Sequence, residues 1–462
     1  MTHRKKTRAQ PDDRSQLHLI CDYVALESLT PNPHNARVHS KAQIQRIADS
    51  IKEHGWVFPV VVNAAGLIIA GNGRWQAGKL LGLQTCPVIR LEHLSADECT
   101  ALALVDNKLV EEATWNEPEV DRQLQALTLK FDIPKISALT GFAVQEVDFR
   151  IERIGNAAAR DRDDEFDALP DGDPVTRLGD LWLLGDHRVL CGDALARASY
   201  EMLMGPDRAH MVFTDAPYNV KIRNVAGRGR RRFREFAQAS GEKSRDAFTD
   251  FLSTALRLMG AHCTGGALLY SCMDWRHQGE ICAAVDNVFG QLLNVAIWVK
   301  PSGGMGSLYR SAYELIFITK NGSAPHCNNV QLGKFGRTRT NVWTYDRPVR
   351  FGQSSADDRF AGEHPTPKPV ALVADAIMDA TDRGQIVLDG FLGAGSSLIA
   401  AERVGRRCRG IEIDPRYVDL TIRRFEHVTG KQARLGNGKT FAEVARQRGI
   451  ELSPSLKNNK RR

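Results

Sequence analysis

An acid and an aromatic stand close together in residues 211–222, which read MVFTDAPYNVKI. The apolar residues predict a buried strand that ends at Asp215, with Tyr218 as an exposed aromatic in the loop beyond. This pair suits chemistry on the exocyclic amine of a nucleobase. A carboxylate and a backbone carbonyl that accept both N–H groups concentrate electron density on the amine nitrogen. We therefore expect Asp215 and the carbonyl of Ala216 to bind the amine, and Tyr218 to stack on a base taken out of a duplex.

A second strand end carries the signature of a nucleoside site, in QIVLDGFLGAGSSLIAAERVG. The strand ends in Asp389, and Gly393 and Gly395 let the backbone turn tightly into a helix. The next predicted strand, CRGIEID, ends in Glu412, about 20 residues further on, where an acid typically holds a ribose hydroxyl pair. The two strand ends together indicate a site for a nucleoside-containing cofactor.

Two alternatives to that interpretation stay open. A glycine turn of this kind also occurs as a tight strand-to-helix connection with no ligand. NAD is the other nucleoside ligand to weigh, but the loop lacks the full G-x-G-x-x-G spacing. Asp389 would also repel a pyrophosphate. An acidic loop suits a cofactor that carries a cation, such as the sulfonium and ammonium of S-adenosylmethionine.

Short apolar strands alternate with helical stretches between about residues 176 and 428. This alternation predicts a mostly parallel, doubly wound α/β sheet. Such sheets bind ligands outside the carboxyl ends of their strands, where both motifs stand. The predicted strands are HMVFTD, GGALLYS, NVAIWVK, YELIFITK, QIVLDGFLG and CRGIEID.

Three motifs resemble those of amino-methylating DNA methyltransferases. TDAPYNV resembles their catalytic D-P-P-Y motif, and LDGFLGAGSSLIAA resembles their cofactor motif, D-x-F-x-G-x-G. HPTPKPVALVADAI, residues 364–377, resembles their H-P-T-x-K-P segment. The catalytic motif comes first and the cofactor motif last, as in the permuted β class. The resemblance covers roughly residues 178–426 and implies a DNA methyltransferase domain over residues 178–428, with a Rossmann-like, S-adenosylmethionine-dependent sheet that methylates a flipped base in double-stranded DNA.

The resemblance also implies roles for individual residues around the cofactor. Thr366 and Lys368 would lie near the methionine end of S-adenosyl-L-methionine, and Asp193, in HRVLCGDAL, would lie near its adenine. An in-line transfer of this kind needs no metal ion. The implied cofactor-binding residues are Asp193, Thr366, Lys368, Asp389, Phe391, Gly393, Gly395, Ser396 and Glu412.

Ala216 departs from the family pattern, which usually has Pro at that position. The position supplies its main-chain carbonyl, which every residue has, and Pro217 still restricts Ala216 to extended conformations. We expect the catalytic set Asp215, Ala216, Pro217 and Tyr218 to act on adenine N6, because cytosine-N4 enzymes of the family more often begin the motif with Ser. Cytosine-N4 methylation stays an alternative, as does a catalytically weak DNA-binding regulator.

The chain has a formal net charge of +7, and two Arg-rich runs concentrate positive charge in predicted loops. These runs are RGRRRFR, residues 228–234, and GKFGRTRT, residues 333–340. A solvated surface is one interpretation of each run, and contact with DNA phosphates is the other. The expected DNA-binding residues are Arg230, Arg232, Arg337 and Arg339.

Target recognition is expected between the catalytic and cofactor motifs, in about residues 300–360. This segment carries Gly, Arg and aromatic residues in loops, and Trp343 or Tyr345 would pack against bases. YELIFITK within it is instead predicted to be a core strand. Pairing of subunits is common in this class, and a homodimer stays open.

Residues 18–110 predict a smaller α+β domain. HSKAQIQRIADSIKEHGW places Ile44, Ile47 and Ile51 on one helical face, with Ser40 as a helix N-cap. FPVVVN, LIIAG and CPVIRL are predicted strands, and RWQAGKLLG is a predicted helix. SADECTALALVDNKLVEEATW opens with S-x-x-E, the signature of a capping box before a long helix.

This N-terminal segment resembles the N-terminal domain of the ParB family of partition proteins. Its GNGRWQAGKLLG stands where the partition proteins have G-E-R-R-x-R-A and bind a nucleoside triphosphate. A Gly-rich turn at a helix start, with an Arg, suits a phosphate. Fewer positive charges than in the family leave nucleotide binding open, with a structural turn as the alternative. We expect Gly71, Asn72 and Arg74 to hold a phosphate of a nucleotide or of DNA.

The rest of the chain connects and flanks the two domains. Residues 111–154 predict a helical extension, residues 155–177 a linker rich in Asp, Pro and Gly, and residues 429–462 a basic, weakly ordered tail. The nine cysteines show no C-x-x-C pair and no metal-ligand spacing. No apolar run could span a bilayer, and the basic N-terminus lacks the apolar segment of a secretory signal. We therefore expect a cytoplasmic protein with no metal and no membrane partner.

Overall fold

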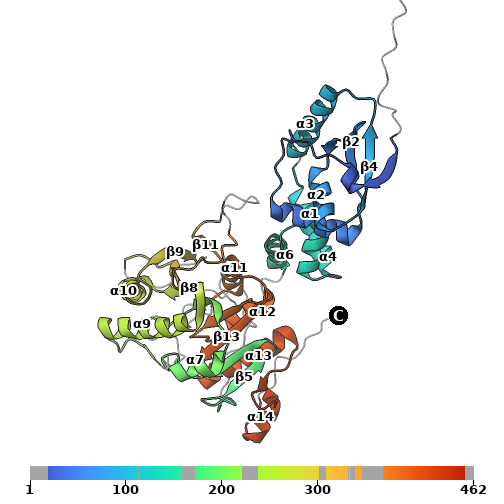
Figure 1. The fold of residues 1–462 in the computed structure, drawn as a ribbon. Coiled ribbons are helices and arrows are strands. Elements are labelled where there is room, and N and C mark those ends of the chain that lie inside the picture. Colours follow the sequence, from blue (N-terminus) through green and yellow to red (C-terminus); the bar gives the residue numbers. More distant parts are fainter. Residues whose placement is uncertain are drawn as a thin grey trace, which may run out of the picture. The chain divides into compact units, whose positions relative to one another are not determined.

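The computed structural model describes residues 19–112, 114–158, 172–220, 238–300, 308–330, 332, 339–345 and 368–452. The chain divides into two compact units, with the boundary between Ile151 and Glu152. Each unit contains its own β-sheet (Figure 1).

The first unit is built around a four-stranded sheet of order β1-β4-β2-β3. Leu26, Val62 and Ile68 are among its buried core residues, and Trp56 and Trp75 pack against them. Its elements are β1 (Cys21–Ala25), η2 (Leu26–Ser28), α1 (Lys41–His54), β2 (Val60–Asn63), β3 (Ile68–Ala70), α2 (Asn72–Leu80), β4 (Thr85–Leu91), α3 (Ala96–Glu112), α4 (Glu117–Thr128), α5 (Ile133–Thr140) and α6 (Val144–Ala158).

Both predicted helix caps of this unit are present. The Ser40 hydroxyl accepts a hydrogen bond from the Gln43 N–H (3.1 Å) at the start of α1. Before α3, the Glu98 carboxylate accepts from the Ser95 N–H (2.9 Å), and the Ser95 hydroxyl accepts from the Glu98 N–H (3.3 Å). This reciprocal pair satisfies backbone donors that the helix itself leaves unpaired. Helices α4 to α6 form the predicted helical extension.

The second unit contains a ten-stranded sheet of order β11-β9-β10-β8-β7-β12-β13-β6-β5-β14. Its five central strands, from β8 to β6, pair in parallel, which confirms the predicted doubly wound α/β fold. Its strands are β5 (Leu181–Leu184), β6 (His187–Cys191), β7 (Ala209–Thr214), β8 (Cys263–Met273), β9 (Leu292–Val299), β10 (Tyr313–Lys320), β11 (Val342–Thr344), β12 (Ile386–Asp389), β13 (Arg407–Glu412) and β14 (Arg434–Leu435).

Helices cover this sheet and complete its core. Phe248 and Leu252 of α9 and Ile281 of α10 share a hydrophobic cluster with Val212 of β7 and Leu269 of β8. Strands buried in this way read as near-continuous apolar runs, which is why they stood out in the sequence. The helices are α7 (Arg197–Met204), α9 (Arg245–Ala261), η3 (Trp275–His277), α10 (Gln278–Phe289), α11 (Val370–Ala380), α12 (Ser396–Arg403), α13 (Pro415–Thr429) and α14 (Phe441–Gln447).

Parallel pairing brings the two predicted motifs to the same edge of the sheet. In the register of β12 and β7, Leu388 stands opposite Val212. Because parallel strands end at the same edge, the loop after β7 and the loop after β12 must open next to each other. The antiparallel strand β10 starts at this edge too, since Leu315 stands opposite Met273 near the end of β8.

The prediction of a weakly ordered tail is wrong for residues 434–447. Strand β14 pairs antiparallel with β5, and α14 begins with a capping box made by Thr440 and Glu443. Phe441 is buried, and its ring lies 5.5 Å from that of Trp182. The T-x-x-E signature and the apolar spacing of Phe441, Val444 and Ala445 were signals of this helix in the sequence.

The predicted linker, residues 155–177, ends earlier in the structure than predicted, because its last residues pack onto the second unit. Val175 and Thr176 are buried, and their N–H groups donate to the two oxygens of Asp419 on α13 (2.6 and 3.0 Å). These residues therefore belong to the second unit. Across the described ranges, no helix is long and apolar enough to cross a membrane.

Candidate active site

A hydrogen bond joins the two strand ends that carry the predicted motifs. The Thr214 hydroxyl, at the end of β7, donates to the Asp389 carboxylate at the end of β12 (3.0 Å). Asp389 also accepts from the Phe391 N–H (3.0 Å) and from the Ser397 hydroxyl (2.7 Å). Burial raises the pKa of Asp389 to about 6, although these three hydrogen bonds oppose the rise. Asp389 thus holds the turn together, and its direct contact with a cofactor stays a prediction.

The glycine loop after Asp389 packs against α13 on one side and is open on the other. Gly395 has φ +80°, and a Cβ placed on it would lie 2.7 Å from the Thr421 methyl group of α13. Thr421 also donates a hydrogen bond to the Gly393 carbonyl (3.0 Å), and Arg424 donates to the Ala394 carbonyl (2.9 Å). A Cβ on Gly393 would meet no atom within 4 Å. The loop therefore presents open backbone on the side away from α13.

The predicted ribose-binding acid lies at this loop. Glu412, at the end of β13, accepts from the Gly393 N–H through one carboxylate oxygen (2.8 Å) and from the Asp414 N–H through the other (2.8 Å). Burial raises the pKa of Glu412 to about 7, and the nearby charges of Asp414 and Asp389 add to the rise. Each oxygen of an ionised carboxylate can accept a second bond. Glu412 therefore keeps acceptor capacity for a diol.

Three other predicted cofactor residues surround the same edge. Asp193 follows β6, and its carboxylate accepts from the Leu195 N–H (2.9 Å). Ser396 is buried at the start of α12 with its hydroxyl 3.4 Å from the Arg424 guanidinium, so this hydroxyl faces α13. The Phe391 ring packs 5.8 Å from that of Phe251. Their contacts with a cofactor stay predictions.

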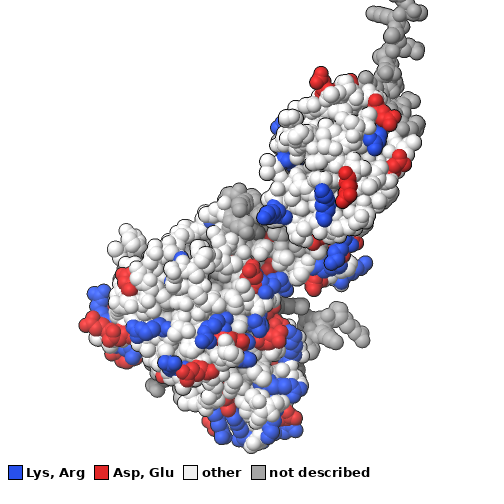
Figure 2. Space-filling view, viewed as in Figure 1, with Lys and Arg blue, Asp and Glu red and all other residues white. Residues whose placement is uncertain are grey.

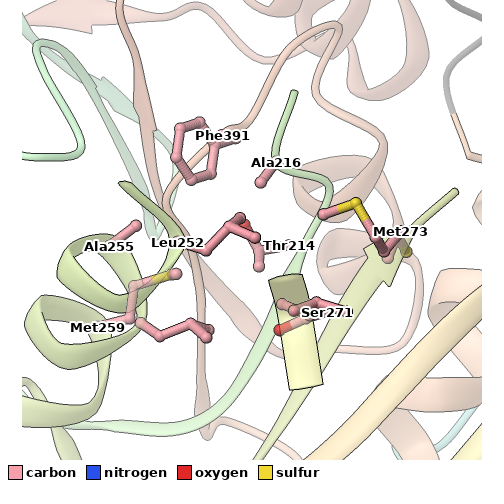
Figure 3. Close-up of a pocket in the computed structure, with 11 residues that line it drawn as sticks. Thr214, Ala216, Leu252, Ala255, Met259, Ser271, Met273 and Phe391 are labelled. Atoms are coloured by element: carbon pink, nitrogen blue, oxygen red, sulfur yellow. The ribbon is translucent and has the colours of Figure 1, made fainter. Parts of the chain in front are cut away.

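A small apolar pocket lies beneath both loops (Figure 3). Its volume is about 10 Å³, which is room for a water molecule and not for a nucleoside. Ala216 is buried and lines it together with Thr214 and Phe391. The side chain of Ala216 is therefore part of the packed floor of the site.

Asp215 and Tyr218 meet in the catalytic loop as predicted, but Tyr218 is not the exposed aromatic that the sequence suggested. Tyr218 is half-buried, and its hydroxyl lies 2.6 Å from the Asp215 carboxylate. Lys368, which precedes α11, reaches the same loop, with its ammonium 2.5 Å from Asp215 and 3.1 Å from the Tyr218 oxygen. Burial and the charge of Asp215 raise the pKa of Tyr218 far above its usual value. The phenol is therefore neutral and anchored.

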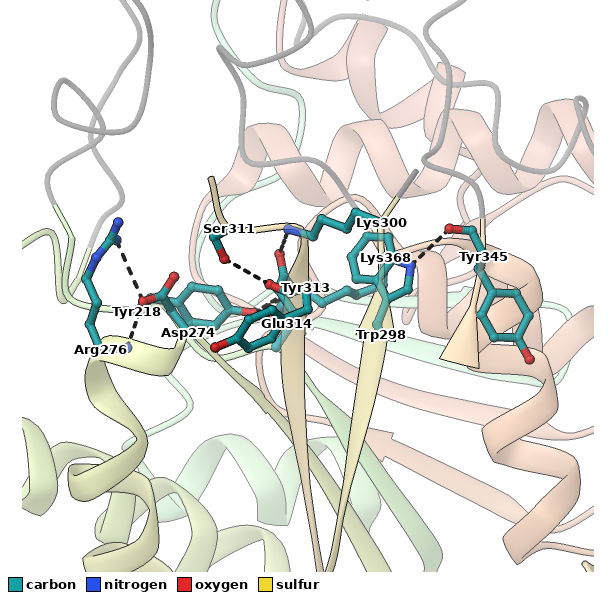
Figure 4. Close-up of polar contacts among 11 residues, drawn as sticks. Tyr218, Asp274, Arg276, Trp298, Lys300, Ser311, Tyr313, Glu314, Tyr345 and Lys368 are labelled. Carbon is teal, nitrogen blue, oxygen red and sulfur yellow. Dashed lines mark hydrogen bonds and ion pairs between the residues drawn. The ribbon is translucent and has the colours of Figure 1, made fainter. Parts of the chain in front are cut away.

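Two further charged residues belong to this cluster, and the sequence analysis missed both (Figure 4). Glu314 of β10 lies 3.0 Å from the Lys368 ammonium and 3.1 Å from the Tyr218 hydroxyl. Lys300, just after β9, forms an ion pair with the other oxygen of Glu314. Burial opposes ionisation of Glu314, but Lys368 and Lys300 hold its pKa at about 2. The signal for Glu314 was an acid at the start of YELIFITK, a segment that was predicted to be a core strand.

Arg339 belongs to an ion-pair cluster with two acids of α11, and its contact with DNA stays a prediction. Its guanidinium lies 2.7 Å from Asp379 and 3.4 Å from Asp375 of α11, and 4.9 Å from the centre of the Trp343 ring. The Tyr345 hydroxyl donates to Asp375. Trp343 is buried, so its ring is not free to pack against a base, whereas Tyr345 is half-buried and its predicted contact with a base stays a prediction. Arginine alone does not indicate surface exposure, because a paired arginine can be buried.

Several predicted residues lie outside the described residues. These residues are Arg230, Arg232, Arg337 and Thr366. Much of the expected recognition region, residues 300–360, lies outside them too. Their roles stay predictions.

The predicted phosphate turn of the first unit has the expected local geometry. Gly71 is the N-cap of α2 with φ +100°, and a Cβ on it would lie 3.0 Å from the Arg74 guanidinium. Asn72, the first residue of α2, is buried. Burial lowers the pKa of Arg74, and the charge of Asp106 opposes this effect. Glycine therefore makes room for a partly buried cation at a helix start.

The fold and the two adjoining loops define the class of the second unit as an α/β domain of the methyltransferase type. Residues 209–423 match the family model described as DNA methylase, and residues 9–108 match the ParB N-terminal domain. The chain therefore contains a DNA methylase domain, and a ParB N-terminal domain precedes it, as the resemblance implied.

Individual relatives agree with both assignments. Over 76 residues, the chain is 42% identical to the ParB-like nuclease domain-containing protein YnaK of Escherichia coli, which covers 16% of this chain and 87% of that protein. It is 31% identical to the type II methyltransferase M2.DpnII of Streptococcus pneumoniae over 29% of this chain and 52% of that protein. It is 33% identical to the DNA adenine methyltransferase YhdJ of Escherichia coli over 25% of this chain and 39% of that protein. The chain thus spans about half or less of these methyltransferases.

Two solved structures also match parts of the chain. The PvuII DNA methyltransferase, which is cytosine-N4-specific, superposes with a TM-score of 0.41 and 16% identity, covering 60% of this chain and 94% of that chain. The partitioning protein ParB from Caulobacter crescentus, complexed with CTP-γ-S, gives a TM-score of 0.27 and 23% identity over 29% of this chain and 78% of that chain.

Proposed function

We propose that this protein is a site-specific DNA methyltransferase that uses S-adenosyl-L-methionine to methylate adenine N6 in double-stranded DNA. The observation that carries the proposal is the hydrogen bond between Thr214 and Asp389. This bond supports the proposal because Asp215, which we propose binds the amine, directly follows Thr214, while the glycine loop and its neighbouring acid Glu412 follow Asp389. Adenine is favoured over cytosine because relatives such as YhdJ are adenine enzymes.

The glycine loop and its neighbouring acids suit the cofactor. The open face at Gly393 admits a ligand close to the backbone, and Glu412 keeps acceptor capacity for ribose hydroxyls. Asp193, on the neighbouring strand end, would bind near the adenine of the cofactor. When bound, S-adenosyl-L-methionine supplies a methyl group on a sulfonium, and the carbon–sulfur electron pair returns to sulfur as the amine nitrogen forms the new bond.

Residues of the catalytic loop act on the target amine. One oxygen of Asp215 and the carbonyl of Ala216 accept the two N–H groups, which raises the electron density on nitrogen. Asp215 then takes the proton that the methylated nitrogen must lose. The anchored ring of Tyr218 offers a face on which the flipped base stacks. This face suits a base that has left the duplex, because a paired base could not reach the loop.

A methyl-transfer assay with product identification tests the proposal. Purified protein is incubated with unmethylated DNA and labelled S-adenosylmethionine, and the DNA is digested to nucleosides. N6-methyladenine is the expected product. Asp215→Ala should abolish transfer, while Asp286→Ala, on the exposed face of α10, should leave it intact. N4-methylcytosine as the sole product would contradict the adenine specificity.

A catalytically weak, ParB-like DNA-binding regulator is the second candidate, and the replacement of the usual proline by Ala216 favours it. Wild-type protein that binds DNA but transfers no methyl group to any sequence would establish this alternative. The proposal also includes a cytoplasmic location, double-stranded DNA as partner and a phosphate contact at Gly71, Asn72 and Arg74. We also propose that the turn binds a nucleotide and that the protein forms a homodimer. A nucleotide-binding measurement tests the first proposal, and sedimentation tests the second.

A further inference from the structure

The amine-binding carboxylate of the catalytic loop is already occupied by the protein itself. The Lys368 ammonium lies 2.5 Å from one oxygen of Asp215, and the Tyr218 hydroxyl lies 2.6 Å from the other. A target amine that is to donate its N–H groups to Asp215 must compete with both. Lys368 is 5% exposed, so leaving its charge without a carboxylate would cost much more than the incoming hydrogen bond returns.

Glu314 is the second acceptor for both of these donors. Its Oε2 atom lies 3.0 Å from the Lys368 ammonium and 3.1 Å from the Tyr218 hydroxyl. A hydroxyl donates one hydrogen bond, so the Tyr218 proton can go to Asp215 or to Glu314. Both donors can therefore leave Asp215 without moving out of reach of a carboxylate.

Lys300 keeps Glu314 ionised and oriented toward Lys368 and Tyr218. It pairs with Oε1, which leaves Oε2 toward Lys368 and Tyr218. Two carboxylates and two ammonium groups make the cluster neutral overall, so shifting Lys368 from one carboxylate to the other moves no net charge into the site. Lys368 therefore keeps a carboxylate partner in either arrangement, which avoids the cost of an uncompensated buried charge.

On these grounds we propose that Glu314 is a positioning residue that draws Lys368 and the Tyr218 hydroxyl away from Asp215 when the target base enters. The inference rests on the proposed function. Without Glu314, Asp215 is the one carboxylate left to Lys368 among the ion pairs of the described residues, and the Lys368 ammonium stays in the place that the amine needs. Glu314 therefore acts through Lys368 and does not touch the base.

A double-mutant cycle of Glu314 and Lys368 tests this inference by single-turnover methyl transfer. Glu314→Gln should lower the rate by roughly ten- to a hundredfold. In the Lys368→Met background, where no ammonium group occupies Asp215 and only the Tyr218 hydroxyl competes with the amine, the same substitution should lower it by less than about threefold. Equal effects of Glu314→Gln in the two backgrounds would overturn the inference. A merely structural role predicts such equal effects.

Three controls separate this outcome from misfolding and from failure of the proposed function. Glu280→Gln removes another buried acid of the same unit, one paired with Arg245 (3.1 Å), and should not change the rate. Glu314→Asp keeps the charge beside Lys300, so its rate should lie between those of the wild type and Glu314→Gln. This variant replaces Glu314→Gln in the test if Glu314→Gln does not fold. The Glu314 and Glu280 variants should bind S-adenosylhomocysteine like the wild type, and the two variants that carry Lys368→Met should bind it equally to each other. A wild-type protein without transfer would contradict the proposed function, whereas an active wild type with equal effects contradicts the inference alone.

Discussion

The Gly393 N–H donates to the Glu412 carboxylate at 2.8 Å, so the glycine loop and the neighbouring strand end form one unit. The hydrogen bond joins the loop after β12 to the last residue of β13, and these two strands are adjacent in the sheet. Glu412, which is about 20 residues from Asp389 in the sequence, is therefore held directly beside the open backbone at Gly393.

Cofactor affinity should depend on pH through Glu412. Burial raises the pKa of this group to about 7, and the ionised form is the better acceptor for ribose hydroxyls. Affinity for S-adenosylhomocysteine should therefore weaken as the pH falls below 7, by up to about tenfold per pH unit. Calorimetric titration between pH 5.5 and 8.5 measures it. Glu412→Gln should bind more weakly at high pH and show a flat profile; an unchanged slope in this variant would assign the effect to another group.

Gly395→Ala should destabilise the second unit, because its φ of +80° and the Thr421 methyl group at 2.7 Å both exclude a Cβ. We expect a loss of about 1–3 kcal/mol in the free energy of unfolding, measured with urea. Gly393→Ala is the matched control. It also has positive φ but faces open space, so it should cost less stability and instead weaken cofactor binding. A larger stability loss for Gly393→Ala would contradict this division of roles.

Ala216→Pro should change the methyl-transfer rate only modestly, within about tenfold, which corresponds to about 1.4 kcal/mol. The carbonyl that binds the amine is present in either residue, and Pro217 already restricts the backbone at this position. Packing limits any increase in the rate, because Ala216 lines a pocket of only about 10 Å³, which leaves little room for the proline ring. Single-turnover kinetics measure the rate. A much larger increase would mean that the alanine is the main defect of the catalytic loop.

Arg339→Ala should lower the free energy of unfolding and leave the salt dependence of DNA binding unchanged. The substitution leaves Asp379, 3% exposed on its side chain, without the guanidinium that lies 2.7 Å away. Breaking a buried pair in this way costs about 3–5 kcal/mol. Urea unfolding measures the loss, and Arg310→Ala, an exposed arginine, should stay within about 0.5 kcal/mol of wild type. If Arg339 contacts phosphate, the salt dependence of DNA binding would change instead.

Local patterns account for the parts of the fold that were predicted. The apolar runs of β7, β10 and β12 and the caps of α1 and α3 depend on neighbours in the sequence, so periodicity and capping signals were sufficient. The C-terminal helix α14 was missed although Thr440 and Glu443 carry the same capping signature. A basic composition outweighed that signal in the prediction, while burial of Phe441 against Trp182 decided the structure.

The sequence by itself determined the class of this protein, because its catalytic and cofactor motifs are each contiguous. Only the tertiary structure decided which charges meet at Asp215. Lys300, Glu314 and Lys368 come from separate segments, and pairing of β9, β10 and β8 brings the first two to the edge of the sheet where Asp215 lies. Arg339 shows the same limit in the opposite direction. An arginine in a basic run resembles a DNA contact until α11 places Asp375 and Asp379 beside it, because burial and pairing are properties of the fold and not of the local sequence.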